Sequence, residues 1–269
     1  MCRTETQLSD LPPVGLLVDQ TLKAAFNASW TKYFGSAELP LAFYYTDAED
    51  GSERVPVPSA HMCMIGVLAR VRKGSSLCFD VDSIGCAGGR RYTGFKSEIS
   101  PTFEYFLSCG LPGKFEGERY KKTPELVREM VRIAPKFTAP ARFIVFKRFD
   151  KLSEQDDPAA VIFFATPDVL SGLFTLANFD ESEPNGVFCP FSAGCGSIVQ
   201  YPFLENGSER PRAVLGMFDV SARPCVPKET LTFSVPMKKF LRMAGNMEES
   251  FLITHSWDKV RRRIIPEKA

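Results

Sequence analysis

Three cysteines in separate segments are the residues of this sequence best suited to chemistry: Cys63, Cys86 and Cys195. Each is expected at or near the start of a helix or in a glycine-rich turn. Backbone N–H groups point outward at such places and lower the pKa of a thiol, which favours a thiolate that binds metal or reacts. The clearest case is Cys86, inside the glycine-rich, basic turn 84–94. No standard enzyme signature accompanies it. The sequence therefore indicates the position of a candidate site more clearly than the reaction that takes place there.

A metal site built on these cysteines would have to be assembled by the fold from distant segments. Compact zinc sites use C-x2-C pairs, and this chain has none; even Cys189 and Cys195, the other candidate pair, lie too far apart. The chain has only 2 histidines, which excludes a histidine-rich centre. Thiolates favour zinc, copper or an iron–sulfur cluster, and three of them would leave one metal position open.

The competing interpretation of these cysteines is structural, because free cysteines are often buried as small hydrophobic residues. It applies most strongly to four others: Cys2, Cys78, Cys109 and Cys225.

The Cys86 turn could also bind a small anion. Gly88 and Gly89 offer successive backbone N–H groups, and Arg90 and Arg91 add two guanidinium groups, which is the composition of an anion-binding nest. The turn has neither the P-loop pattern nor the dinucleotide-binding fingerprint. The alternative is a tight turn with two solvated arginines. The sequence leaves both interpretations open.

The elements expected to position these residues are short apolar strands that alternate with amphipathic helices. Ser59 is a good N-cap for a helix that ends at Arg72, which would place Cys63 in the first turns. Ser192 could cap a helix that carries Cys195. Further helices are predicted at 15–34, 101–109, 124–134, 166–178, 236–246 and 256–263, and strands at 39–46, 77–80, 141–147, 160–165, 187–191, 213–218 and 230–235. This alternation predicts an α/β or α+β fold with a mixed sheet flanked by helices.

The length and composition fit one globular domain. The chain has 269 residues, of which 44% are hydrophobic and 24% charged, which argues against disorder. We expect a single domain over 1–269, which could comprise two closely packed lobes, 1–140 and 141–269. Phe is unusually common, with 23 copies, so the chain could build a Phe-rich pocket wall as well as a Phe-rich core.

The charge and the cysteine content limit the partners and the compartment. The formal net charge of +1 argues against broad binding to nucleic acid or anionic membranes. No apolar run is long enough to span a membrane, and the N-terminus lacks the apolar segment of a secretory signal. Eight cysteines without an export signal are typical of cytosolic thiols or metal ligands. We therefore expect a cytoplasmic protein.

An ordered series of short features covers about residues 40–245. Its parts are Pro40-Leu41-Ala42-Phe43, Cys63 with Ala69-Arg70 and Lys73-Gly74, Cys86-Ala87-Gly88-Gly89 with Gly94, Val161-Ile162 to Pro167, Cys195, Leu215-Gly216 leading to Arg223, and Val235-Pro236. In this order the chain resembles the archaeal and bacterial family called domain of unknown function 169. The resemblance selects Cys63, Cys86 and Cys195 from the eight cysteines, whereas Cys189 has no clear counterpart. Ala87 stands where members often have proline. The resemblance implies no activity.

The first functional hypothesis is a cytosolic metalloprotein that holds an iron–sulfur cluster on Cys63, Cys86 and Cys195, with zinc as the alternative metal. An open iron would support redox or Lewis-acid chemistry on a small anionic substrate, and redox chemistry would require an electron-transfer partner. The anion would be held by one of three arginines: Arg90, Arg91 or Arg223.

The second hypothesis is a metal-free protein that binds a small anion in the Cys86 turn and a Phe-rich cleft. A third makes Cys86 a nucleophile or redox thiol, and we rank it last because neither histidine has the local context of a partner base.

Overall fold

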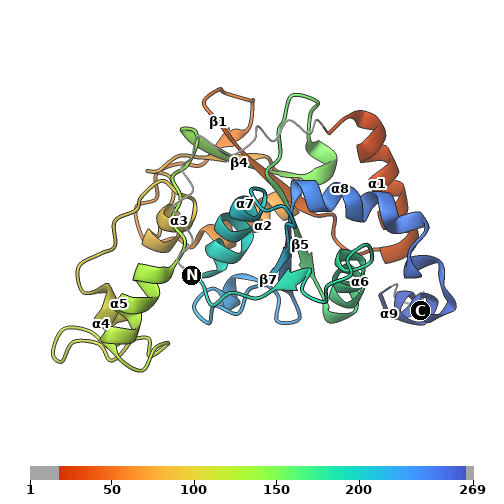
Figure 1. Ribbon diagram of the computed structural model, residues 1–269. Helices are drawn as coiled ribbons and strands as arrows, with labels where there is room; N and C mark the ends of the chain where they lie inside the picture. The colour runs from red at the N-terminus through yellow and green to blue at the C-terminus, as the bar shows by residue number, and fades with distance from the viewer. Residues whose placement is uncertain (1–17, 265–269) are drawn as a thin grey trace.

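The computed structural model describes residues 18–264, and one mixed sheet forms its centre (Figure 1). Its strands are β1 (Leu41–Thr46), β2 (Glu53–Arg54), β3 (Leu77–Phe79), β4 (Phe143–Arg148), β5 (Ala160–Ala165), β6 (Val187–Phe188), β7 (Ala213–Gly216) and β8 (Leu231–Pro236). The order across the sheet is β2-β3-β4-β1-β5-β8-β7-β6. The two outermost pairs, β2–β3 and β6–β7, are parallel, and the pairs between them are antiparallel. The predicted mixed sheet is confirmed, within an α+β fold.

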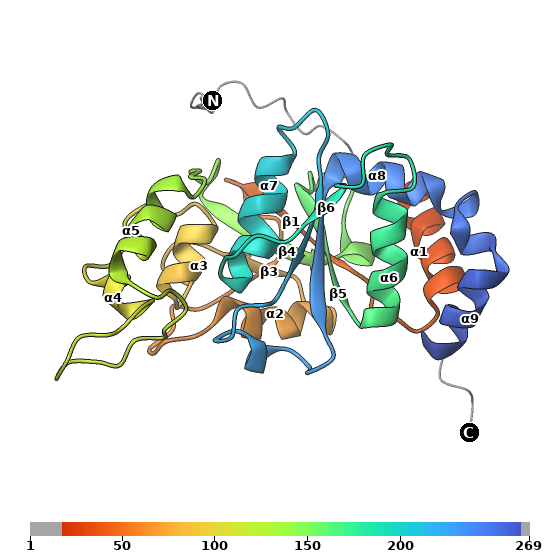
Figure 2. The ribbon, with the colours of Figure 1, turned by 60° about the horizontal axis from the view of Figure 1, so that its bottom comes forward.

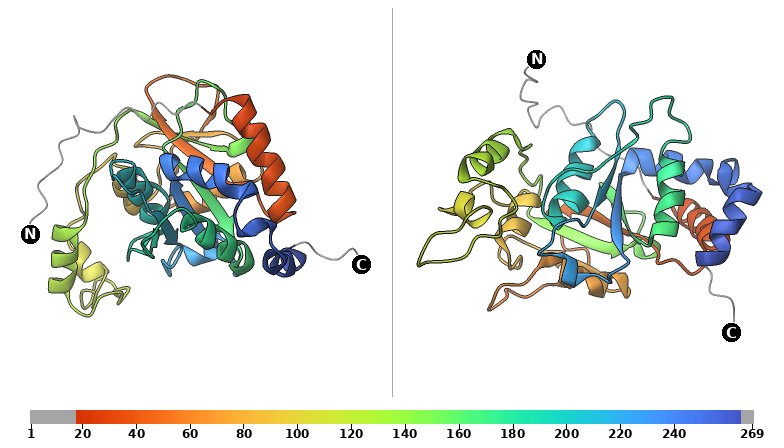
Figure 3. Two further views of the ribbon diagram at one scale, coloured as in Figure 1. Left: turned by 45° about the vertical axis from the view of Figure 1, so that its right-hand side comes forward. Right: turned by 90° about the horizontal axis from the view of Figure 1, so that it is seen from below.

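Helices cover both faces of this sheet, as Figure 2 shows. One face packs against α1 (Gln20–Phe34), α6 (Pro167–Ala177), α8 (Met237–Gly245) and α9 (His255–Ile264). The other face packs against α2 (Met64–Arg72), α3 (Ala87–Tyr92) and α7 (Tyr201–Glu205). The short α4 (Phe103–Phe106) and α5 (Pro124–Ile133) lie in a segment that projects away from the sheet, drawn in yellow-green in Figure 3.

The sheet has two apolar faces, which explains why its central strands are apolar throughout. In β1, Leu41 and Phe43 belong to the core on the α2 side, whereas Ala42 and Tyr44 belong to the core on the α1 side. Successive side chains of a strand point to opposite faces, so both must be apolar when helices cover both. Full burial of a Leu or Phe side chain contributes roughly 1.5–3 kcal/mol. The two cores therefore hold the sheet in place.

Side-chain caps and a glycine set several helix ends. The helix predicted at 15–34 begins at Gln20 in the described residues, where Asp19 caps it, with its Oδ1 accepting a hydrogen bond from the Leu22 amide at 2.7 Å. Thr123 caps α5 in the same way, with Pro124 in the first turn. Gly35 ends α1 with a φ of 61°, a conformation that favours glycine. The predicted helix at 101–109 is reduced to the single turn of α4.

Two predictions near the cysteines are wrong. Ser59 does not cap α2; the helix begins after Cys63, whose own backbone is extended and forms the N-cap. The residues before it are not helical: Ser59 and Ala60 form a bend, and Met62 packs against Gly85, where a Cβ would lie only 2.9 Å from the Met62 amide nitrogen. The Cys86 segment is not an open glycine turn but continues into α3. Cys195 is helical, as predicted, and precedes the π-helical turn Gly196–Gln200.

The sheet crosses the proposed lobe boundary near residue 140. β4, from the second half, lies between β1 and β3 from the first half. A division at residue 140 therefore does not separate the strands, and two lobes are not confirmed. In residues 18–264, no helix is both long enough and apolar enough to cross a membrane.

Candidate functional site

The three predicted cysteines lie in one apolar cluster on the α2 side of the sheet. Cys195 is buried there, and Cys63 and Cys86 are half-buried and pack against the same residues. Cys225 joins this cluster from the loop before β8. The fold thus brings four cysteines from four separate segments to one place. We call Cys63, Cys86, Cys195 and Cys225 the thiol cluster.

Cys86 is the most acidic thiol of the cluster. Its Sγ accepts a hydrogen bond from the Gly89 amide at 3.2 Å. A hydrogen bond with the Cys195 thiol is the main cause that lowers the pKa of Cys86 to about 6, with smaller contributions from the Met64 amide and the charge of His61. Burial opposes this shift but does not cancel it. At neutral pH Cys86 is therefore mostly a thiolate.

Cys195 and Cys63 retain their protons at neutral pH. The hydrogen bond to Cys86, together with burial, raises the pKa of Cys195 well above its usual range, and the negative charges of Cys86 and Asp219 add to the effect. Burial also raises the pKa of Cys63 to about 11, with a smaller contribution from its neighbour Cys225. The thiols that influence each other's pKa most strongly are therefore Cys86 with Cys195 and Cys63 with Cys225.

Gly89 allows the Cys86 thiol to approach the backbone closely. A Cβ at Gly89 would lie 2.6 Å from Ile84 Cγ2 and 2.9 Å from Cys86 Sγ. Gly88, the preceding residue, has nothing within 4 Å of the same position. The two glycines therefore have different roles, and only Gly89 is required by the packing of the site.

The cysteines of the described residues form no disulfide bonds. All seven cysteines within residues 18–264 are free. In that same part of the chain, no three His, Cys, Asp or Glu side chains form a ready ligand set for one metal ion. The remaining cysteines lie elsewhere: Cys78 is buried on the α1 side, Cys109 and Cys189 are exposed, and Cys2 lies outside the described residues.

Comparison with known proteins places the chain in a family. A family model described as DUF169, uncharacterised ArCR, matches residues 31–246. The chain belongs to the DUF169 family. The matched region includes the whole thiol cluster and confirms the resemblance. No curated protein and no solved structure gave a significant match. The function of this DUF169 protein must therefore be argued from its site.

The arginines predicted to hold an anion all donate hydrogen bonds to carbonyl oxygens. Arg90 Nε donates to the carbonyl of Ile84 at 2.7 Å, and Arg91 Nη1 donates to that of Ser97 at 2.8 Å. Arg223 donates to carbonyl oxygens within its own loop. An anion would have to displace these bonds, so the contacts give little support to a preformed anion site.

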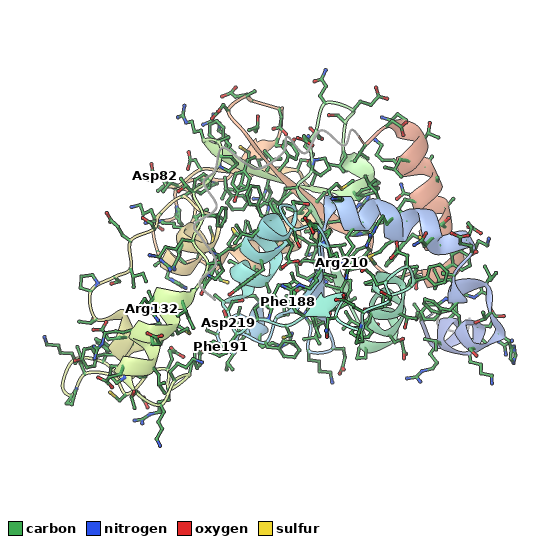
Figure 4. The ribbon with its side chains drawn as sticks, in the orientation of Figure 1. Asp82, Arg132, Phe188, Phe191, Arg210 and Asp219 are labelled. Atoms are coloured by element: carbon green, nitrogen blue, oxygen red, sulfur yellow. The ribbon has the colours of Figure 1, made fainter. Side chains whose placement is uncertain are left out.

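Sequence reasoning missed Cys225, because the nearby Pro224 and Pro227 favoured a structural interpretation. The only available signal was the Leu215-Gly216 to Arg223 feature of the DUF169 pattern, which ends two residues before Cys225. A second missed residue is Asp219, labelled in Figure 4, whose Oδ2 accepts a hydrogen bond from the Gly194 amide at 3.0 Å. This bond fastens the Cys225 loop to the segment that carries Cys195.

Proposed function

We propose that this DUF169 protein is a cytoplasmic metalloprotein whose Cys63, Cys86 and Cys195 hold an iron–sulfur cluster. The observation that carries the proposal is that these thiols, from three separate segments, meet in one apolar cluster. A purely structural role would bury each cysteine on its own as a neutral thiol. Here the thiols interact, and hydrogen bonds lower the pKa of Cys86 to about 6, which favours its thiolate form. A bound metal would stabilise this thiolate further.

Metal binding would replace the protons of the cluster. Thiolates are the ligands that bind zinc and iron, so each thiol must lose its proton when the metal arrives. Cys86 has already released its proton, whereas Cys195 would release its own on binding. Because no histidine belongs to the thiol cluster, its ligands are all soft, as in iron–sulfur and thiolate–zinc centres.

The pairwise arrangement favours a cluster over a single zinc ion. Each thiolate of a four-iron cluster binds a different iron, so its ligands need not converge on one point. Three thiolates on four irons would leave one iron open for a small substrate, and redox chemistry there would require an electron-transfer partner. The free thiols are typical of a reducing compartment such as the cytoplasm.

The test is chemical reconstitution of anaerobic protein with iron and sulfide. Single Ser variants of Cys63, Cys86 and Cys195 should each lose iron and visible absorption, while a Cys109→Ser variant should load like the wild type because Cys109 is exposed and apart from the cluster. Wild-type loading by all three variants would disprove the proposal.

A second candidate function is dithiol redox chemistry by Cys86 and Cys195. The specific observation in its favour is their hydrogen bond, in which one sulfur is a thiolate and the other a thiol. The Cys86 thiolate would attack a disulfide substrate and displace one thiolate. Cys195, once deprotonated, would then release the second and leave a Cys86–Cys195 disulfide. Mass spectrometry after exposure to glutathione disulfide should find this cross-link, and protein without it would exclude this function.

A further inference from the structure

Residues 95–138 leave the body of the molecule and return to the same place, as the yellow-green segment of Figure 3 shows. We call this segment, which contains α4 and α5, the arm. Its two ends meet where the Ala139 amide donates a hydrogen bond to the Gly94 carbonyl at 2.9 Å. Gly94 has a φ of 79°, and a Cβ there would lie 2.6 Å from the Ala139 nitrogen. The base of the arm therefore requires glycine.

Both ends of the arm are attached to elements that carry thiols. The arm follows α3 closely, and Cys86 is the N-cap of that helix. At the other end, buried Gln200 donates from its Nε2 to the Pro135 carbonyl at 2.7 Å. Gln200 is the last residue of the π-helical turn that follows Cys195. The arm is thus joined to the elements of two thiols of the cluster.

A side chain of the arm also contacts the body near Cys195. Lys121 Nζ lies 4.0 Å from the centroid of the Phe191 ring, and Phe191 precedes Cys195 by four residues. Phe191 is nevertheless 59% exposed. Phe218 and Val220 are exposed as well, on the loop before β8, which is fastened to the segment of Cys195. Apolar side chains on two loops near the thiol cluster are therefore accessible to a partner.

The arm exposes more of its large apolar side chains than it buries. Val127 is buried, whereas four others are exposed: Phe106, Phe115, Leu126 and Ile133. Together with the three on the body, they make seven of the 11 exposed large apolar residues among residues 18–264. Exposed apolar side chains that gather in one region mark a site of protein interaction.

The charge at the tip of the arm is positive. Residues 114–122 contain two acidic residues and four basic ones, Lys114, Arg119, Lys121 and Lys122. The acidic residues of α4 and α5 all form ion pairs with Arg128 or Arg132, whereas none of the ion pairs among residues 18–264 involves the four basic residues of the tip. Opposite charges steer the encounter of two proteins, so this surface fits an acidic partner.

We propose that the exposed apolar residues of the arm and of the two loops form the docking surface of a small acidic electron-carrier protein. This inference rests on the proposed function, in which redox chemistry requires an electron-transfer partner. Electron-transfer complexes are short-lived and bury less than about 1,200 Å² of surface, so a small apolar area with a positive surround is sufficient. In the transfer, the carrier loses one electron and the iron–sulfur cluster gains it, and no atom is exchanged.

The experiment titrates a small acidic ferredoxin into metal-free and reconstituted protein by calorimetry, at low and at high salt. The test variants are Phe191→Ala with Phe218→Ala, which removes apolar contacts, and Lys114→Glu with Lys122→Glu, which reverses charge. The control is Phe174→Ala with Phe179→Ala, because these rings are exposed as well but belong to α6 and the turn after it.

We expect the wild type to bind the ferredoxin and to lose affinity as the salt concentration rises. Each test variant should bind at least about tenfold more weakly, as expected for the anchor residues and charges of an interface. The control should match the wild type. Urea unfolding should be unchanged in every variant, because the replaced side chains are exposed. In stopped-flow mixing, reduced ferredoxin should reduce the loaded protein.

The outcomes separate this inference from the proposed function. Equal affinity of the wild type and the Phe191→Ala, Phe218→Ala variant overturns the docking surface, and tighter binding of a basic cytochrome overturns the acidic partner. Loaded protein that does not bind the ferredoxin, or binds it without being reduced, overturns the inference alone. Protein that holds no iron after reconstitution overturns the proposed function, whatever the ferredoxin binding.

Discussion

Gly89 and Gly88 offer a matched pair of substitutions that tests the packing of the Cys86 thiol. Both lie in α3, and alanine at either position should relieve the entropic cost of a helical glycine, about 0.5–1 kcal/mol. Only at Gly89 does the added methyl group meet an obstacle, since it would lie 2.6 Å from Ile84 Cγ2 and 2.9 Å from Cys86 Sγ.

The magnitude follows from the difference between the two variants. The helix-propensity gain is common to both and cancels, which leaves the cost of overpacking, about 1–3 kcal/mol. For a domain of this size each kcal/mol corresponds to about 2–4 °C in Tm. We therefore expect Gly88→Ala to be neutral or slightly stabilised and Gly89→Ala to be less stable than Gly88→Ala by about 1–3 kcal/mol.

The assay combines urea unfolding with the pH dependence of Cys86 alkylation. The added methyl group should push the sulfur away from the Gly89 amide and weaken the hydrogen bond that helps to lower its pKa. The alkylation midpoint of Gly89→Ala should therefore move above about 6, while that of Gly88→Ala should not. Equal stability and equal midpoints in the two variants would refute the account of how the backbone holds this thiol.

Three further predictions concern the thiol pair and the rest of the fold. Cys195→Ala removes the main cause that lowers the pKa of Cys86, so the alkylation midpoint should rise from about 6 toward the ordinary thiol value; an unchanged midpoint would contradict the pair. Lys147 Nζ lies 3.0 Å from half-buried Asp50 and 2.9 Å from buried Asp156. Lys147→Ala should lower the free energy of unfolding by about 3–5 kcal/mol, because both carboxylates lose their cation. A free energy of unfolding in urea within about 1 kcal/mol of the wild type would be inconsistent with this. Gly172→Ala should loosen α9, because the new methyl group would collide with the Trp257 ring, and amide exchange in α9 should accelerate more than in α5.

The parts of the fold that were predictable are those set by local chemistry. The apolar run of β5 and the cap at Thr123 act within a few residues, so the sequence contains their whole cause. The start of α2 was missed because Ser59 is a good local cap, whereas the chain packs against Gly85 at Pro58 and Met62 and becomes helical only after Cys63. Tertiary contacts outweighed local preference there.

The thiol site was predictable in part. The resemblance selected Cys63, Cys86 and Cys195, and the fold brings them together. Two glycines in succession favour a turn, so the helix α3 was not expected; the contacts of Gly89 with Ile84 and Cys86 explain why a small residue stands there. Cys225 was missed because its role depends on a loop that reaches the site through Asp219. The spacing of residues in the sequence does not show that this loop reaches the site.

The most direct test of the central claim is the iron and acid-labile sulfide content of anaerobically purified protein, measured beside a triple Ser variant of Cys63, Cys86 and Cys195. The account predicts near-stoichiometric iron and sulfide with visible absorption in the wild type, and neither in the triple variant. Colourless, metal-free wild-type protein after reconstitution, or a fully loaded triple variant, would contradict it.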